Sequence, residues 1–296
     1  MPLAKARIAF LHQALAQRLT KARMCPYCRE PTPLTSLGRK RLIIEVLRCE
    51  RCLLVFRYPP DDPRLSVRYY DSAYEAAAVT CVPEQVELAH WCNASFRGTP
   101  VDLTSKIDVL KAIRPLGKVL DYGCSWGYGV FQLAVRGYDA VGFEISKRRA
   151  ELGRNKLKVT IIDNLVELKA IGRGAFDVVF GNHVIEHLPD LAESLDTFAH
   201  VLKDDGLIFQ VLPNFTGRTA RGGAFWNWIG RDHPIAPTAA FLGRNLHRHG
   251  FRDVAIASGP FDEGLVEAAR SGAWAGCDTE GDELLVIAWR TPRGGG

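Results

Sequence analysis

The sequence predicts an α/β protein with a doubly wound parallel sheet, preceded by a small module that holds two cysteine pairs. Residues 118–146 read as a strand, a glycine-rich turn, a helix and a second strand. Helices and strands continue to alternate to the end of the chain, and repeated βα units imply a parallel sheet with ligands at the carboxyl ends of its strands. The length of 296 residues allows one large domain or two smaller ones.

Composition is that of an ordinary globular protein, with 47% hydrophobic and 24% charged residues. No apolar run is long enough for a membrane span and no signal-peptide core is present, so we expect a cytoplasmic protein without a membrane span. Residues 1–29 carry six lysines and arginines and no acid, which accounts for the net charge of +5. The remaining chain is close to neutral, and this argues against a broad nucleic-acid-binding face.

Residues 1–23 are predicted to form a basic amphipathic helix, with apolar residues on one stripe. These residues are Ile8, Leu11, Leu15 and Leu19. The helix could dock on the protein's own surface, target the chain to an organelle or contact a membrane. Its lack of serine favours docking over a transit peptide.

Two Cys-x-x-Cys pairs lie in residues 24–60, at Cys25 and Cys28 and at Cys49 and Cys52. This spacing predicts a zinc ribbon, in which four thiolates surround one tetrahedral zinc ion. Two disulfides are the alternative, but nothing in the sequence suggests secretion. Four protein ligands leave no open position for a substrate, so the zinc would be structural.

The strand that begins at residue 118 ends on a carboxylate, Asp121, and the following turn contains Gly123, Gly127 and Gly129. A second carboxylate, Glu144, ends the next strand. A dinucleotide site requires Gly-x-Gly-x-x-Gly, and Ser125 breaks that pattern. A glycine-rich turn of some other α/β protein is a further alternative.

This turn resembles the first motif of class I S-adenosylmethionine-dependent methyltransferases, Asp/Glu-x-Gly-x-Gly-x-Gly, with Ser125 at the middle glycine. The resemblance implies a Rossmann-like seven-stranded methyltransferase sheet over residues 103–290 and S-adenosylmethionine as the cofactor. In that family the glycines lie against the methionine moiety, and the acid matched by Glu144 binds the ribose hydroxyls. The resemblance also implies cofactor contacts from Asp121, Gly123, Ser125, Gly127, Asp163, Asn164, Asn182 and His183.

Later elements follow in the order that such a sheet needs. We expect helices at 103–113, 147–155, 191–202 and 239–249, and strands at 159–162, 176–180, 207–212, 254–257 and 283–288. A turn is expected at 204–206. The last two strands look like the antiparallel pair at the sheet edge of the same methyltransferases.

The strand at 176–180 is followed by Asn182, His183, Glu186 and His187. If the chain turns helical after Asn182, the two histidines and the glutamate share one face of its first turn; a polar helix start beside solvent is the alternative. The motif resembles the Glu-x-x-Glu-His of ubiquinone-pathway O-methyltransferases, where it is associated with magnesium and substrate. His183 replaces the first glutamate, and magnesium prefers oxygen ligands, so a magnesium site is disfavoured here.

One aromatic segment lies within the region that resembles a methyltransferase, and another precedes it. Residues 213–238 are predicted to form a lid over an organic substrate, with Trp226 and Trp228, or else a helical hairpin over the core. Residues 61–102 are predicted to be a helical connector or cap, in which Tyr70 and Tyr74 either cover the cofactor or pack at an interface. The ribbon and these tyrosines together resemble the N-terminal module of bacterial methyltransferases of polysaccharide, glycolipid and secondary-metabolite pathways.

The resemblance implies methyl transfer to a small-molecule, sugar or lipid-linked acceptor, with oxygen favoured as the methylated atom. Methylation at oxygen benefits from a positioned base. The candidates are His187 and His233, with Glu186 orienting. Two alternatives stay open: an RNA methyltransferase that uses the ribbon to hold RNA, and a non-catalytic zinc-ribbon binding protein. The sequence does not specify the acceptor or the oligomeric state.

Overall fold

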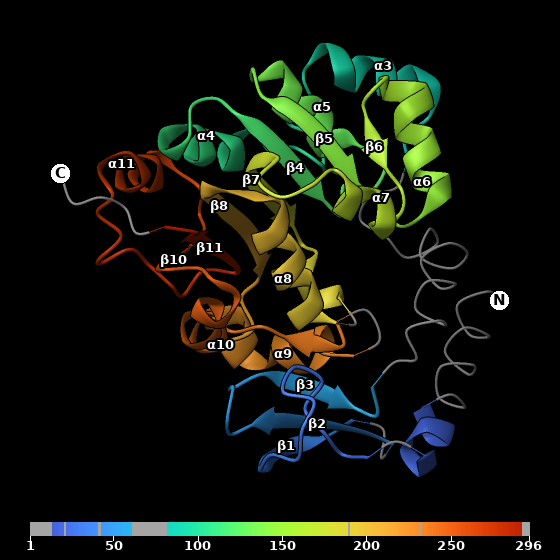
Figure 1. The fold of residues 1–296 in the computed structure, drawn as a ribbon, viewed down its shortest axis with the longest axis vertical. Coiled ribbons are helices and arrows are strands. Elements are labelled where there is room, and N and C mark those ends of the chain that lie inside the picture. Colours follow the sequence, from blue (N-terminus) through green and yellow to red (C-terminus); the bar gives the residue numbers. More distant parts are fainter. Residues whose placement is uncertain are drawn as a thin grey trace.

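The computed structural model describes residues 14–20, 22–40, 43–60, 82–188, 190–230 and 233–291. These residues form a four-stranded sheet of order β1-β2-β3-β9 and a seven-stranded sheet of order β10-β11-β8-β7-β4-β5-β6 (Figure 1). Tyr70, Tyr74 and residues 1–13 of the expected N-terminal helix lie outside the described residues. Residues 14–20 are helical.

The seven-stranded sheet is mostly parallel. Its strands are β4 (Lys118–Tyr122), β5 (Asp139–Phe143), β6 (Ile161–Ile162), β7 (Phe176–Asn182), β8 (Leu202–Pro213), β10 (Asp253–Ser258) and β11 (Glu283–Trp289). The first five pair in parallel, whereas β10 and β11 form an antiparallel edge. The predicted doubly wound sheet is therefore confirmed. The chain runs from β4 outward to β6 and returns to β7 beside β4, which makes the ends of β4 and β7 a topological switch point where ligands bind in such folds.

Helices cover both faces of this sheet. They are α3 (Gln85–Asn93), α4 (Thr104–Ile113), α5 (Tyr128–Val135), α6 (Lys147–Leu152), α7 (Leu165–Ala170), α8 (Leu191–Val201), α10 (Ala239–Asn245) and α11 (Glu263–Ser271). Neighbouring strand residues alternate between two apolar clusters: Val119 packs with α4, α5 and α11, and Leu120 packs with α8, α10 and the ribbon. Among the described helices, none is long and apolar enough to cross a membrane.

Some expected boundaries were wrong. The helix predicted at 147–155 ends at Leu152 and continues as a π-helical segment, η2 (Gly153–Leu157), and β6 is shorter than the strand predicted at 159–162. The turn predicted at 204–206 lies instead within β8. Opposite these residues, the pairing of β7 with β8 shifts register between Phe176 and Val178. Helices α7 and α11 were not predicted. Both begin at a side-chain cap, from Asn164 and Asp262.

The smaller sheet joins two distant parts of the chain. Strands β1 (Leu34–Lys40), β2 (Ile44–Cys49) and β3 (Val55–Tyr58) form an antiparallel sheet in the cysteine module. The fourth strand, β9 (Ile235–Ala236), comes from the segment predicted as a lid, and Val55 pairs with Ala236. The module lies below the larger sheet in Figure 1, next to α9 (Phe225–Trp228) and α10.

Candidate active site

The glycine turn after β4 is tightly packed. Gly123, Ser125 and Gly127 have φ values of 75°, 53° and 83°, in the left-handed region that favours glycine. Ser125 therefore adopts the conformation that the resembled motif gives to a glycine, and its hydroxyl accepts a hydrogen bond from Arg149. A Cβ atom on Gly123 would lie 2.7 Å from Val184, just beyond β7. The main chain of the turn at Gly123 therefore packs so closely against Val184 that a side chain at position 123 would not fit.

Asp121 and Glu144 lie buried beside this turn. The two oxygens of Glu144 accept hydrogen bonds from the main-chain N–H groups of Ser125 and Ser146, at 2.9 and 2.8 Å. Burial, together with the charge of Glu144, raises the pKa of Asp121 to about 7. Main-chain donors thus hold both oxygens of Glu144 in place directly after β5. The residues therefore fit the adenosyl cofactor that the turn implies.

The remaining residues predicted to bind the cofactor have partners within the protein. Asp163 forms an ion pair with Arg154 at 2.9 Å. The exposed Asn164 caps α7, because its Oδ1 accepts the N–H of Glu167. Asn182 accepts a hydrogen bond from Lys106 Nζ at 2.9 Å.

His183, Glu186 and His187 are brought together, but the expected helix face was wrong. His183 has a φ of 56°, and only Ile185–His187 form a helical turn, the 3-10 segment η3. The main-chain N–H of His183 still donates to Val211 of β8, at 2.7 Å. Pairing in the sheet thus extends past β7 and delays the helical turn.

Glu186 lies at the centre of this group. Glu186 is fully buried, and its Oε1 lies 3.5 Å from His183 Nδ1 and 3.8 Å from His187 Nε2. Burial acts to raise the pKa of Glu186, but the neighbouring His183, His187 and His233 outweigh it and lower that pKa. Glu186 is therefore ionised at neutral pH.

A second acid, Glu283, continues the network on the other side of His183. Its Oε1 lies 2.6 Å from both His183 Nε2 and Lys106 Nζ. Burial opposes ionisation of both partners, yet the pKa of His183 rises to about 9 because of Glu186 and Glu283. The pKa of Glu283 falls to about 2 because of His183 and Lys106. Sequence reasoning missed Lys106 and Glu283; the available signal was an acid at the start of the otherwise apolar β11.

His233 joins the group from the other end of the sequence. Its ring centroid lies 4.7 Å from that of His187, and one ligand atom each from Glu186, His187 and His233 lie within 4.8 Å of one another. His233 Nδ1 lies 3.0 Å from the main-chain oxygen of Trp228. A carbonyl oxygen can only accept, so Nδ1 carries the proton of the neutral ring and Nε2 is its basic nitrogen. These three side chains could accept a proton or, by distance alone, hold a metal ion.

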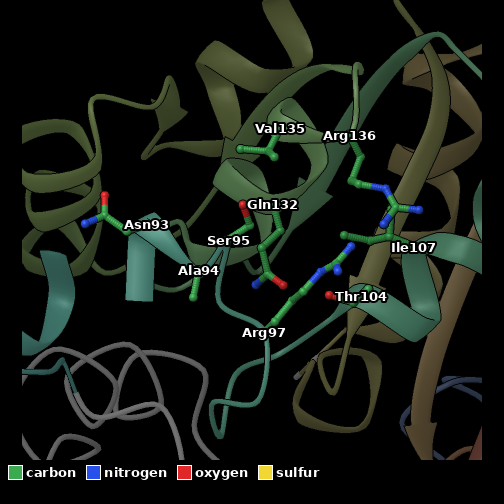
Figure 2. Close-up of a pocket in the computed structure, with 9 residues that line it drawn as sticks. All are labelled: Asn93, Ala94, Ser95, Arg97, Thr104, Ile107, Gln132, Val135 and Arg136. Carbon is green, nitrogen blue, oxygen red and sulfur yellow. The ribbon is translucent and has the colours of Figure 1, made fainter. Parts of the chain in front are cut away.

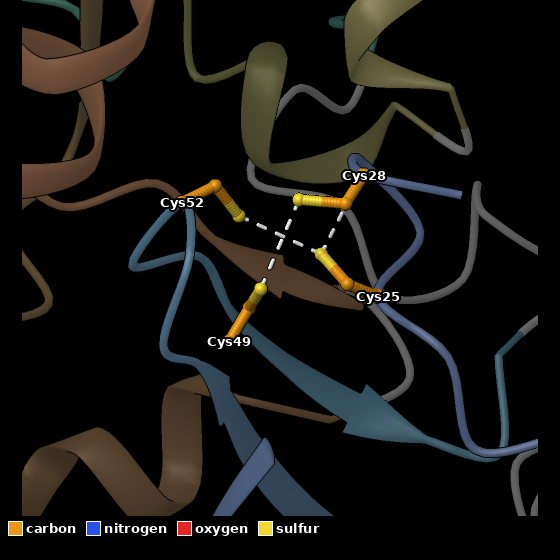
Figure 3. A group of neighbouring side chains, drawn as sticks. All are labelled: Cys25, Cys28, Cys49 and Cys52. Carbon is orange, nitrogen blue, oxygen red and sulfur yellow. Dashed lines mark hydrogen bonds between the residues drawn. The ribbon is translucent and has the colours of Figure 1, made fainter. Parts of the chain in front are cut away.

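The four cysteines form the other group with metal-binding geometry. Their side chains point toward a common centre (Figure 3). The Sγ atoms of Cys25 and Cys52 lie 3.6 Å apart, and those of Cys28 and Cys49 lie 3.8 Å apart. Zn–S bonds of about 2.3 Å in a tetrahedron place sulfurs about 3.8 Å apart. The donor set therefore fits zinc.

The aromatic segment 213–238 packs against the ribbon. Phe215 and Ile229 are buried with Val46 and Val55, and Phe225 and Trp228 pack on the same cluster. Trp226 is 37% exposed, and its ring lies against Gly38 of β1. This contact was not anticipated, and a role for the segment as a lid stays a prediction.

A separate cavity of about 250 Å³ lies between α3, α4 and α5 (Figure 2). Arg97, Gln132 and Arg136 are among its lining residues. None of the residues predicted for the cofactor or for catalysis lines it, so we assign it no part in the reaction.

More than half of the chain matches a known protein family. A family model described as a methyltransferase domain matches residues 97–256, just over half of the chain. The chain belongs to this methyltransferase family. The glycine turn with Asp121 and Glu144 lies within the matched residues.

Individual relatives match shorter regions of this methyltransferase. A stretch of 113 residues is 32% identical to the polyketide synthase ThaQ of Burkholderia thailandensis, covering 35% of this chain and 5% of that protein. Another of 108 residues is 28% identical to the ubiquinone biosynthesis O-methyltransferase of Sinorhizobium fredii, covering 35% of this chain and 44% of that protein. The chain thus spans less than half the length of these curated relatives.

A solved structure confirms the fold. An S-adenosylmethionine-dependent methyltransferase of Thermotoga maritima superposes with a TM-score of 0.50 at 15% identity, covering 70% of this chain and 96% of that one.

Proposed function

We propose that this methyltransferase transfers the methyl group of S-adenosylmethionine to an oxygen of a small-molecule, sugar or lipid-linked acceptor. In this proposal His187 or His233 is the general base and Glu186 orients it. One observation carries the proposal: two histidines from separate segments meet beside the buried carboxylate of Glu186, just past the carboxyl end of β7. In a doubly wound sheet this end borders the ligand crevice.

The cofactor supplies an electrophilic methyl group on sulfur. We assign its binding to the turn from Asp121 to Gly127 and to the carboxylate of Glu144, which would accept from the ribose hydroxyls. The chain's further contribution is to align the acceptor oxygen with that methyl group and to keep water out, which is an effect of proximity and orientation.

The base follows from the arrangement of hydrogen bonds around the histidines. Trp228 fixes Nδ1 of His233 as the donor, so Nε2 can take the proton of an acceptor hydroxyl. The ionised Glu186 would stabilise the imidazolium that forms, as a buried carboxylate does beside other catalytic histidines. An acceptor with an acidic hydroxyl would need no base, and alignment alone would then suffice.

A small acceptor is supported over RNA by charge and by the relatives. The basic residues in excess belong to residues 1–29 rather than to a broad face of the domain. The matched O-methyltransferase of Sinorhizobium fredii is named for ubiquinone biosynthesis and not for a nucleic acid. A steep fall of RNA affinity with salt would favour RNA instead.

We assign structural zinc to Cys25, Cys28, Cys49 and Cys52. The domain division that goes with this proposal is a basic helix at 1–23, the zinc ribbon at 24–60, a connector at 61–102 and the methyltransferase domain at 103–290.

A screen of glycan, nucleotide-sugar and phenolic acceptors tests the proposal by release of S-adenosylhomocysteine. We expect turnover with an acceptor that presents a hydroxyl group, and mass spectrometry should place the new methyl group on oxygen. Transfer only to RNA, or to nitrogen or carbon, would contradict it.

A further inference from the structure

Arg57 of the ribbon reaches across to the segment that carries His233. It lies on β3 and is 2% exposed. Its Nε donates to the main-chain oxygen of Gly230 at 2.7 Å, and its main-chain N–H donates to the oxygen of Pro234 at 2.9 Å. Arg57 therefore holds the chain on both sides of His233.

The turn that contains His233 is closed through the same glycine. The N–H of Gly230 donates to the main-chain oxygen of His233 at 3.0 Å, and Ile229 and His233 form an isolated β-bridge. Gly230 thus contacts both residues: its N–H donates to His233, and its carbonyl oxygen accepts from Arg57. Any shift of this carbonyl would move the main chain that sets the His233 ring against Trp228.

A second ribbon cation holds the preceding residues. Lys40, at the end of β1, donates from Nζ to the main-chain oxygens of Trp226 at 2.6 Å and Ile229 at 3.1 Å. Lys40 and Arg57 thus hold main-chain oxygens before and after Trp228 in the sequence. The carbonyl oxygen of Trp228 itself accepts from His233 Nδ1. The ribbon therefore fixes the backbone that selects the tautomer of His233.

Stability alone is a weak reason for a buried arginine at this position. Removing a charge from water is costly, and well-packed apolar residues often serve stability as well or better. What the guanidinium adds is a rigid fork of donors that holds carbonyl oxygens in defined places. The buried Arg57 is therefore better explained by a role in positioning the main chain than by a role in stability.

We propose that Arg57 is a positioning residue for His233: by holding the Gly230 carbonyl with its Nε, it keeps Nδ1 of His233 on Trp228 and leaves Nε2 as the basic nitrogen. The inference rests on the proposed function only in taking His233 as the base. The positioning itself concerns the tautomer of one ring and can be measured without an acceptor.

The test is ¹⁵N NMR of the histidine rings in the zinc-loaded full chain, with the His233 signals assigned by their loss in His233→Asn. In the wild type we expect the Nδ1–H tautomer at pH above the ring's titration. In Arg57→Gln we expect a mixture that approaches the Nε2–H form favoured in water. Arg48→Gln is the matched control, since Arg48 is an exposed ribbon arginine that pairs with Glu50; it should keep the wild-type spectrum.

Two further variants keep the test decisive if Arg57→Gln does not fold. Arg57→Lys keeps the charge and a hydrogen-bond donor group, and it should restore part of the Nδ1–H population. Lys40→Met removes the hydrogen bonds from Lys40 to the main-chain oxygens of Trp226 and Ile229, and it should shift the His233 tautomer in the same direction as Arg57→Gln. An unchanged His233 tautomer in a folded, zinc-loaded Arg57 variant would overturn the proposal, as would an unchanged tautomer in Lys40→Met if no Arg57 variant folds.

Kinetics separate this inference from the proposed function. With an accepted substrate, Arg57→Gln should lower the single-turnover rate by about 10- to 100-fold while the Kd of S-adenosylmethionine stays unchanged. If the tautomer shifts but His233→Asn keeps the wild-type rate, the positioning by Arg57 stands and His233 is not the base.

Discussion

His183 Nε2 lies 2.6 Å from Glu283 Oε1, which ties the residue after β7 to the first residue of β11 across the intervening strand β8. The pKa of His183 rises from its ordinary 6.5 to about 9 on folding. Stabilisation from this charge is therefore fully present below about pH 6.5 and is lost as the pH rises through about 9. Because 38% of the His183 side chain is exposed, solvent screens the pair and reduces the effect.

We accordingly expect the wild type to lose stability between pH 7 and pH 9.5, and His183→Asn to lose less over the same window. The difference should be at most about 1 kcal/mol, as for a screened ion pair. Thermal unfolding at both pH values measures it, with the exposed His200→Asn as control. Parallel curves for wild type and His183→Asn would refute the stabilising role of this charge.

Cofactor binding should depend on the charge of Glu144. Glu144→Gln keeps an oxygen that can accept from the main chain but removes the negative charge, so charge-assisted hydrogen bonds to the ribose are lost. We expect a loss of about 2 kcal/mol, or roughly 30-fold in the Kd of S-adenosylmethionine. Calorimetry measures this, and the exposed Glu151→Gln on α6 is the control. Equal affinities for Glu144→Gln and wild type would exclude a ribose contact.

The cysteine group should hold one zinc per chain. Because binding of structural zinc is part of the folding free energy, Cys25→Ser should lose the metal and unfold at a lower temperature. Elemental analysis of unchelated protein tests this, with Cys277→Ser, outside the cluster, as control. Metal that survives in Cys25→Ser but disappears in Glu186→Gln would belong instead to Glu186, His187 and His233.

Loss of the base should slow methyl transfer without weakening cofactor binding. We expect His187→Ala or His233→Ala to lower the single-turnover rate by about 10² to 10⁴. Calorimetry with S-adenosylmethionine serves as the control, because neither ring belongs to the glycine turn. If both variants keep the wild-type rate, neither histidine is the base, and the chain contributes to the reaction only by aligning the acceptor with the methyl group.

The central sheet could be predicted because local pattern and global fold agree there. The apolar strand before Asp121, the glycine turn and the apolar face of α5 each specify the same βαβ unit. Boundaries were wrong where tertiary contacts decide: β7 keeps pairing through the N–H of His183, so the helical turn begins later than the spacing of Glu186 and His187 suggested.

The candidate site was predictable only in part. Glu186 and His187 could be predicted because they follow directly after a strand. The position of His233 could not be predicted from the residues around it, because it depends on the pairing of β9 with β3. Lys106 and Glu283 are single charges in elements that otherwise read as a helix and an apolar strand. Their partnership appears only when α4 and β11 meet beside His183.

The pairing of β3 with β9 also constrains how the chain can fold as it is synthesised. Val55 emerges from the ribosome long before its partner Ala236, so the outer edge of the ribbon sheet remains open during most of translation. An open strand edge with buried apolar residues such as Val55 and Phe56 is a template for wrong pairing. The ribbon is therefore not a detachable module: in isolation it would expose this edge, and transplanting it to another protein would require a substitute for β9.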